Sequence, residues 1–248
     1  MERTLAIIDG DSLCYLCSKD TIQESVEKID SLIAKILETT GSTDYYLLLS
    51  KGKYFRHNIN EDYKGTRSKS SPLLYLRTLK AYLREQYQAE DWAGVEADDA
   101  VAYIQQQFLD GKFPDISKSF VCAIDKDVIK QVEGSMYNYR KDEYSITTKE
   151  EANKFLHVQS IMGDSGDNIK GIPGKGEAKA KKIIDEVRPE LYPLAAYKAY
   201  LEHFKQPGIA LYEYQKNFRQ VYMLRTDEDF LGAVGYIPEL KDPIKIIT

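Results

Sequence analysis

Short apolar runs alternate with amphipathic stretches along the first 150 residues of the chain. Residues 4–8, 45–49 and 119–124 have the length and composition typical of strands buried on both faces of a parallel sheet. Residues 22–37 place apolar side chains three and four positions apart, which predicts an amphipathic helix, and residues 96–109 predict another. This alternation predicts an α/β fold with a central, mainly parallel sheet flanked by helices.

Weaker signals complete the pattern of elements. Residues 136–139 and 144–147 are expected to be short strands, and Pro72 is suited to the first position of a helix running to about residue 87. The basic, Gly- and Ser-containing stretch 51–71 predicts a loop.

The last hundred residues are mainly helical in pattern. Thr148 is expected to cap a helix of about 15 residues. Further helices are expected near 177–187, 190–204 and 209–225. We predict an α/β core over residues 1–160 and a helical lobe over residues 161–248.

Composition narrows the class of protein. A chain of 248 residues with 43% hydrophobic and 29% charged residues is ordinary for a globular protein. No apolar run approaches the roughly 18–20 residues that span a bilayer, and Asp9 interrupts the first apolar run too early for a secretory signal. We expect a cytoplasmic protein with no membrane partner. Cys14, Cys17 and Cys122 are expected to be packing residues, since the histidines occur singly and offer no zinc site.

The charge is unevenly distributed. The net charge is −5, yet residues 51–84 hold nine basic and two acidic residues, and residues 170–188 hold six basic and three acidic. A protein with an acidic centre and basic flanks can be acidic overall and still bind phosphates.

Carboxylates occur where the predicted strands end, at the edge of an open α/β sheet that usually lines a binding crevice. They are Asp9, Glu96, Asp98, Asp99, Asp125, Asp127, Asp164 and Asp167. If these side chains converge, their repulsion raises several pKa values unless cations are present. Oxygen ligands without nearby His or Cys favour Mg²⁺ or Mn²⁺, and two such ions about 4 Å apart suit phosphodiester cleavage.

Each acidic or basic motif also has a structural interpretation. Residues 96–99 can be acids that the helix dipole favours, and residues 125–127 can be a turn and helix cap. Residues 63–67 can be a solvated basic loop. The joint occurrence of all these motifs, in the order that a sheet would bring together, favours the functional interpretation.

Four ordered motifs carry a resemblance to a known family. They read IIDGDS at 7–12, YKGTR at 63–67, EADD at 96–99 with IDKD at 124–127, and GDSGDNIKGIPGKG at 163–176. The chain resembles the 5′-nuclease or flap-endonuclease superfamily, which includes phage 5′→3′ exonucleases, RNase H-type enzymes and the N-terminal nuclease domain of bacterial repair polymerases. The resemblance covers about residues 5–224. It implies a PIN-like core, a helix-three-turn-helix (helix-hairpin-helix) lobe and a short helical arch or gateway at about 51–92.

The resemblance also implies roles for single residues. Asp9, Glu96, Asp98 and Asp99 would serve a first Mg²⁺ ion, and Asp125, Asp127, Asp164 and Asp167 a second, with Mn²⁺ able to substitute. Lys64 and Arg67 would contact the scissile phosphate. Tyr63 could stack on a terminal base, or it could be one of the packing residues among the 19 tyrosines of the chain. The arch helix would present Arg77, Lys80 and Arg84 to DNA on one face and order on substrate. The hairpin residues Gly171, Ile172, Gly174, Lys175 and Gly176 would bind the duplex backbone through main-chain N–H groups, and such hairpins often hold K⁺.

One position departs from the family pattern. Relatives commonly carry an aspartate before a KGK-x-FR-like segment, where this chain has Ser50. Asp11 is an additional acid that could compensate as a ligand.

The sequence therefore predicts a Mg²⁺-dependent, monomeric 5′→3′ exonuclease and flap endonuclease of DNA replication or repair. Its substrates would be duplex DNA with a 5′ end, flap or nick, and RNA–DNA hybrids if it has RNase H activity. One alternative, suggested by Ser50, is a catalytically weak factor that binds branched DNA. A single-strand ribonuclease is a third, against which the duplex-binding hairpin argues.

Overall fold

The computed structural model describes residues 2–65 and 75–246. These residues divide into two compact units. The first comprises Met1–Tyr54, Ser70–Thr147 and Met223–Thr248, and the second comprises Phe55–Lys69 and Thr148–Tyr222. The division differs from the predicted boundary at residue 160, because the helix before the acidic loop joins the second unit and the C-terminal residues return to the first.

The first unit is built on a seven-stranded sheet in the order β3-β2-β1-β4-β5-β6, with β7 paired to β2. Its strands are β1 (Arg3–Asp9), β2 (Asp44–Leu49), β3 (Glu90–Asp91), β4 (Ile116–Cys122), β5 (Gly134–Asn138), β6 (Glu143–Thr147) and β7 (Ile244–Lys245). Neighbours from β3 to β5 run parallel, whereas β6 and β7 are antiparallel to their partners. The predicted α/β fold with a mainly parallel sheet is confirmed.

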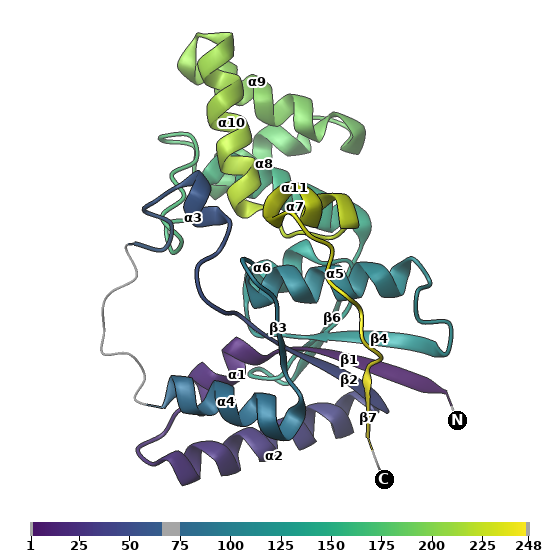
Figure 1. Ribbon diagram of the computed structural model, residues 1–248. Coiled ribbons are helices and arrows are strands. Elements are labelled where there is room, and N and C mark those ends of the chain that lie inside the picture. Colours follow the sequence, from purple (N-terminus) through teal and green to yellow (C-terminus); the bar gives the residue numbers. More distant parts are fainter. Residues whose placement is uncertain (1, 66–74, 247–248) are drawn as a thin grey trace. The chain divides into compact units, whose positions relative to one another are not determined.

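Helices cover both faces of this sheet (Figure 1). They are α1 (Gly10–Cys17), α2 (Ile22–Thr40), α4 (Leu76–Tyr87), α5 (Ala97–Leu109), α6 (Lys126–Gln131) and α11 (Asp227–Val234). Alternate strand residues such as Ala6 and Ile8 pack against α1, α2 and α4 on one face, since successive strand side chains point to opposite faces. Helix α5 covers the other face (Figure 1). Cys14 and Cys17 lie fully buried in α1, where burial raises the pKa of both thiols, in agreement with the predicted packing role.

The sequence pattern gives no bounds for three short helices of this unit, α1, α6 and α11, although it offers residues 125–127 as the cap of α6. Each has six or eight residues, which is too short for a 3.6-residue period to stand out. The predicted gateway helix is α4. Its described part begins at Leu76 rather than Pro72, which lies outside the described residues.

The second unit is helical. It contains α3 (Arg56–Ile59), α7 (Lys149–Met162), α8 (Glu177–Asp185), the 3₁₀ helix η1 (Pro189–Leu191), α9 (Tyr192–Phe204) and α10 (Pro207–Val221). Thr148 caps α7 as predicted, in a capping box with Glu151. The core of the second unit combines aromatic and aliphatic residues with the small residues Ala195, Ala196 and Ala199 of α9.

Candidate metal and nucleic-acid site

Asp9 ends β1, and its carboxylate caps the helix that follows. The backbone N–H groups of Asp11 and Ser12 donate to its Oδ1 at 3.1 and 3.3 Å, and the Ser12 hydroxyl donates to its Oδ2. Burial, followed by the nearby charges of Asp11 and Asp125, raises the pKa of Asp9 to about 6. Buried anions that repel one another are the condition that a bound dication relieves. A cation at this edge of the sheet therefore stays a prediction, which the raised pKa of Asp9 supports.

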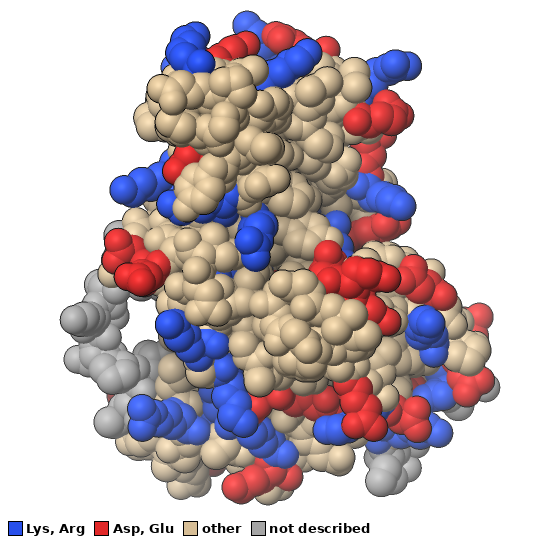
Figure 2. All heavy atoms as spheres, turned by 45° about the horizontal axis from the view of Figure 1, so that its top comes forward, with Lys and Arg blue, Asp and Glu red and all other residues tan. Residues whose placement is uncertain are grey.

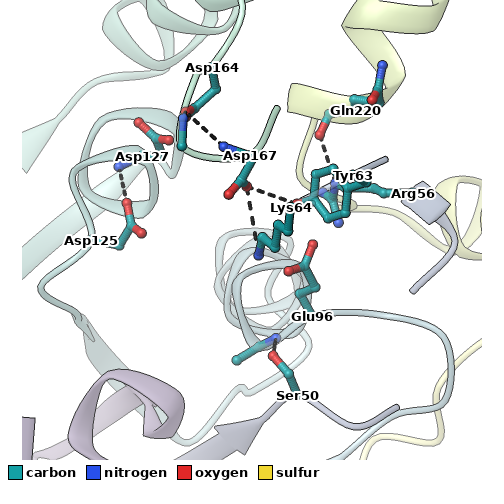
Figure 3. A network of polar contacts seen from close by, with 12 residues as sticks. Ser50, Arg56, Tyr63, Lys64, Glu96, Asp125, Asp127, Asp164, Asp167 and Gln220 are labelled. Atoms are coloured by element: carbon teal, nitrogen blue, oxygen red, sulfur yellow. Dashed lines mark hydrogen bonds and ion pairs between the residues drawn. The ribbon is translucent and has the colours of Figure 1, made fainter. Parts of the chain in front are cut away.

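Asp125 and Asp127 follow β4, the strand beside β1. Asp125 is exposed and caps α6, with its Oδ1 accepting the Asp127 N–H at 2.7 Å (Figure 3). Because β1 and β4 run parallel, both strands deliver their carboxylates to the same edge of the sheet. The structural interpretation of this motif is confirmed, and the cap leaves the second oxygen of Asp125 outside the capping hydrogen bond.

The acidic segment at the start of α5 is held mainly by its own carboxylates. Glu96 and Asp99 form a capping box, in which the Asp99 Oδ2 accepts the Glu96 N–H at 3.1 Å. The other oxygen of Asp99 accepts the Leu224 N–H at 3.1 Å. Asp99 is 0% exposed, so its position supports the segment, whereas Asp98 is half-buried at the first turn. Asp98 is therefore more accessible to a cation than the fully buried Asp99.

Asp11, the additional acid, turns toward Ser50 and Lys80. Its Oδ1 accepts the Ser50 N–H at 3.1 Å and lies 2.6 Å from the Lys80 Nζ. A metal ion bound by Asp11 would therefore have to compete with the ion pair between Asp11 and Lys80.

In the second unit, Asp164 and Asp167 lie on a loop that closes on itself. Asp164 and Ile169 exchange two backbone hydrogen bonds at 2.8 and 2.7 Å. The Asp164 Oδ1 also accepts the Gly166 N–H at 2.7 Å, which fixes its side chain. A side chain on Gly163 would lie 2.5 Å from the Gly171 nitrogen, so glycine is needed where the two ends of the loop meet.

Lys64 and Tyr63 lie against this acidic loop. The Lys64 N–H donates to the Asp167 carbonyl at 2.9 Å, and its ammonium lies 3.7 Å from the Asp167 Oδ2 (Figure 3). The Tyr63 hydroxyl donates to the same oxygen at 3.0 Å. Tyr63 is 4% exposed and packs edge-on against His57, which is a packing role, and its stacking on a terminal base stays a prediction. Arg67 lies outside the described residues.

Sequence reasoning missed the residues that hold this segment. The Arg56 guanidinium is buried and donates to the carbonyls of Gln220 and Tyr222 at 2.8 and 2.7 Å. The Asn60 amide donates to the Gln220 side chain at 2.9 Å, and the Asn168 amide donates to the Asp62 carbonyl at 2.9 Å. Their sequence signal, an arginine and asparagines in a basic loop, is indistinguishable from that of a solvated surface.

The predicted hairpin divides into a buried and an exposed half. Gly171 donates its N–H to the Asn217 side chain at 3.3 Å, and Ile172 donates to the Ile161 carbonyl at 2.8 Å. Both residues are buried, so the prediction that their N–H groups bind a phosphate backbone is wrong. Gly174 and Gly176 are exposed, so their part of the turn faces solvent. Lys175 lies 3.8 Å from Glu202 and is only loosely held.

Helix α4 differs from the expected gateway. Leu79 and Leu83 are fully buried in the core beneath the sheet. Arg77 is exposed, but Lys80 pairs with Asp11, and Arg84 pairs with Asp91 at 2.5 Å. The three cations therefore do not form one free basic face, because two of them neutralise acids of their own unit. On the face shown in Figure 2, basic and acidic side chains are likewise interspersed.

No three His, Cys, Asp or Glu side chains among residues 2–65 and 75–246 lie close enough together to hold one ion. The eight predicted ligands are divided, six in the first unit and two in the second. In the same part of the chain, no helix has the length and apolarity that a membrane crossing requires.

Sequence comparison finds relatives with related names. No family model matches the chain. It is 29% identical over 211 residues to DNA polymerase I of Bacillus subtilis, 26% over 201 residues to a 5′-3′ exonuclease of Mycoplasmopsis pulmonis, and 25% over 260 aligned residues to the flap endonuclease of Escherichia phage T5. These alignments cover 74%, 73% and 94% of the chain. The chain spans only 23% of the polymerase, 66% of the exonuclease and 88% of the phage protein.

Structural comparison gives the same grouping. The T5 flap endonuclease, solved with DNA and metal ions, matches with a TM-score of 0.66 and 21% identity, covering 88% of each chain. The catalytic core of Rad2 with a DNA substrate matches with a TM-score of 0.57 and 12% identity, covering 98% of this chain and 83% of that one. At these identities the likeness concerns the fold. Sequence relatives and fold together confirm the predicted resemblance of this chain to the 5′-nuclease or flap-endonuclease superfamily.

Proposed function

We propose that this chain is a structure-specific 5′ nuclease, acting as a 5′→3′ exonuclease and flap endonuclease in DNA replication or repair. The observation that carries the proposal is the contact of Lys64 with Asp167. It places a cation suited to a phosphate beside a carboxylate suited to a metal, on a loop whose glycines hold it closed. The names of the sequence relatives support the same activity.

The residues present fit hard divalent cations, and we propose Mg²⁺, with Mn²⁺ able to substitute. Asp9, Glu96, Asp98, Asp125 and Asp127 are the candidate ligands of the first unit, with Asp99 behind them, and Asp164 and Asp167 are those of the second. All offer oxygen only, which is the donor that Mg²⁺ prefers in proteins. Divalent ions, when bound, would stabilise the charge that develops on a phosphodiester during hydrolysis.

The chain's own residues bind and orient the substrate in this proposal. Lys64 is aimed by its backbone hydrogen bond to Asp167 and would contact the scissile phosphate. The exposed N–H groups of Gly174 and Gly176, at the start of α8, would hold the duplex backbone, with K⁺ as a further ligand of this turn. Such contacts read no bases, so selection would be for a 5′ end, flap, nick or RNA–DNA hybrid. We further propose that the protein acts as a monomer in the cytoplasm.

A flap-cleavage assay tests this function. A 5′-labelled flap is incubated with the protein and Mg²⁺, and binding is measured separately without divalent ions. Asp125→Asn is expected to abolish cleavage and preserve binding, because it removes a metal-facing charge while an amide oxygen can still cap α6. Asp115→Asn, at a carboxylate that is 81% exposed, is the matched control and should cleave normally.

The same assay separates the second candidate function. Ser50, in place of a ligand aspartate, favours a catalytically weak factor that binds branched DNA. Intact binding of flaps by the unaltered protein without any cleavage would establish that alternative and overturn the nuclease.

A further inference from the structure

Ser50 joins three segments of the first unit through its three polar groups. It follows the last residue of β2 and is buried. Its N–H donates to the Asp11 carboxylate of α1 at 3.1 Å, and its carbonyl accepts from the Lys80 ammonium of α4 at 3.0 Å. Its hydroxyl accepts the Ala97 N–H of α5 at 2.8 Å, the contact drawn at Ser50 in Figure 3. All three polar groups of Ser50 therefore hold neighbouring segments of the first unit in place.

The Ser50 hydroxyl acts at the first turn of α5. The first N–H groups of a helix have no partner within the helix, and each buried one needs an acceptor from elsewhere. The capping box of Glu96 and Asp99 serves one of them, and Ser50 serves the N–H of Ala97. The hydroxyl therefore fixes the segment that carries Glu96 and Asp98 against the carboxyl end of β2.

Lys80 holds this arrangement from the opposite side. Its ammonium bridges the Asp11 carboxylate, at 2.6 Å, and the Ser50 carbonyl, at 3.0 Å. The Lys80 side chain is 16% exposed and Asp11 is 22% exposed, so the pair is shielded and stronger than an open surface pair. Lys80 also neutralises Asp11, which otherwise adds a second full negative charge beside Asp9.

We propose that Asp11, Ser50 and Lys80 form a positioning node, which holds the acidic first turn of α5 ready for divalent cations in place of a carboxylate at position 50. This inference rests on the proposed function, and none of the three residues contacts the substrate in it. Outer partners of metal ligands typically change metal affinity by about 10- to 100-fold when they are removed.

The decisive variant is Lys80→Met. Loss of the Lys80 charge and loss of the contacts of Lys80 predict opposite changes in Mg²⁺ affinity. Removing a cation beside an acidic site tightens Mg²⁺ binding if only charge matters. The node predicts the reverse, a weakening of about tenfold, because the contacts that fix Ser50 and α5 are lost. Lys80→Arg should restore most of the affinity. Mg²⁺ affinity is measured by isothermal titration calorimetry on the DNA-free protein.

Two further variants sharpen the test. Lys51→Met is a control that removes the same charge from the residue after Ser50, where the ammonium pairs with Asp91 at 3.0 Å. This variant should leave Mg²⁺ affinity unchanged or slightly tighter. Ser50→Ala changes no charge, removes the acceptor of the Ala97 N–H, and should weaken Mg²⁺ binding by several-fold. In flap cleavage, Ser50→Ala and Lys80→Met should raise the Mg²⁺ concentration for half-maximal activity and leave the KM for DNA unchanged.

The outcomes of calorimetry decide the proposal independently of cleavage. If Lys80→Met binds Mg²⁺ as tightly as the unaltered protein, or more tightly, the node is overturned. If Lys80→Met does not fold, Ser50→Ala decides alone, and unchanged Mg²⁺ affinity in that variant also overturns it. Normal Mg²⁺ binding without flap cleavage by the unaltered protein would instead refute the proposed nuclease and leave the node standing.

Discussion

Gly171→Ala is expected to damage the second unit severely. Gly171 has a φ of +58°. A side chain there would lie 2.5 Å from the Met162 carbonyl oxygen and nearer still to the Met162 carbonyl carbon and the Gly163 nitrogen. These are backbone atoms of the chain that enters the acidic loop, so they cannot turn aside as a flexible side chain would.

The expected cost has two parts. A non-glycine residue in the left-handed region costs about 1 to 2 kcal/mol. Forcing apart a closely packed contact costs about 1 to 3 kcal/mol more. Gly171→Ala should therefore lower the free energy of unfolding by about 2 to 5 kcal/mol, estimated from those two ranges. It should also abolish flap cleavage, because the paired ends of the loop that carries Asp164 and Asp167 must separate.

Two glycines of the same turn are matched controls. Gly174 has a φ of +74° and open space around its missing side chain, so Gly174→Ala should cost only the backbone strain of about 1 kcal/mol. Gly176 lies outside the positive-φ region and also faces open space, so Gly176→Ala should change stability by about 0.5 kcal/mol or less. Urea unfolding followed by circular dichroism measures all three. Equal losses for Gly171→Ala and Gly174→Ala would refute the assigned contact between the loop ends.

Three further changes test the packing of each unit. Tyr200→Phe should lower stability by about 1 to 3 kcal/mol in urea, because the buried hydroxyl donates to the Ser160 carbonyl at 2.7 Å, while Tyr212→Phe, at a side chain 61% exposed, should not. Burial lowers the pKa of His157, and its hydrogen bond to the Asn153 carbonyl opposes this shift only in part. The unfolded chain therefore takes up the proton first, and stability falls as pH drops below about 6.5. Thermal melts of His157→Gln between pH 5 and 7 should lack this contribution to the pH dependence of stability. Arg3→Met should lower the free energy of unfolding by about 2 kcal/mol or more at pH 7, because it leaves the buried Asp44 carboxylate without its partner. Burial of Asp44 opposes its ionisation, but its hydrogen bonds with Arg3 lower the pKa of Asp44 below 3.8. The loss of stability should therefore shrink as pH falls through that region, and a loss that does not change with pH would contradict the pairing.

Local signals in the sequence predicted most of the sheet and the long helices. The strands containing Ile8, Leu47 and Val121 are continuous apolar runs because both their faces are buried, and this leaves a mark in composition alone. Caps such as Thr148 act within four residues, so they are also visible in the sequence. Short helices and the return of the C-terminal residues to β2 were missed, because no local period marks them.

The sequence by itself determined which residues can carry the chemistry: a set of carboxylates at strand ends, a basic pair, and a glycine turn after two aspartates. Only the tertiary structure decided what each of them does, since contacts between residues far apart in the chain set burial and hydrogen bonding. It buried Tyr63 against Asp167, closed the acidic loop at Gly171, and engaged Lys80 with Asp11. The sequence gives the charge of each side chain, but tertiary packing determines which partner that charge contacts.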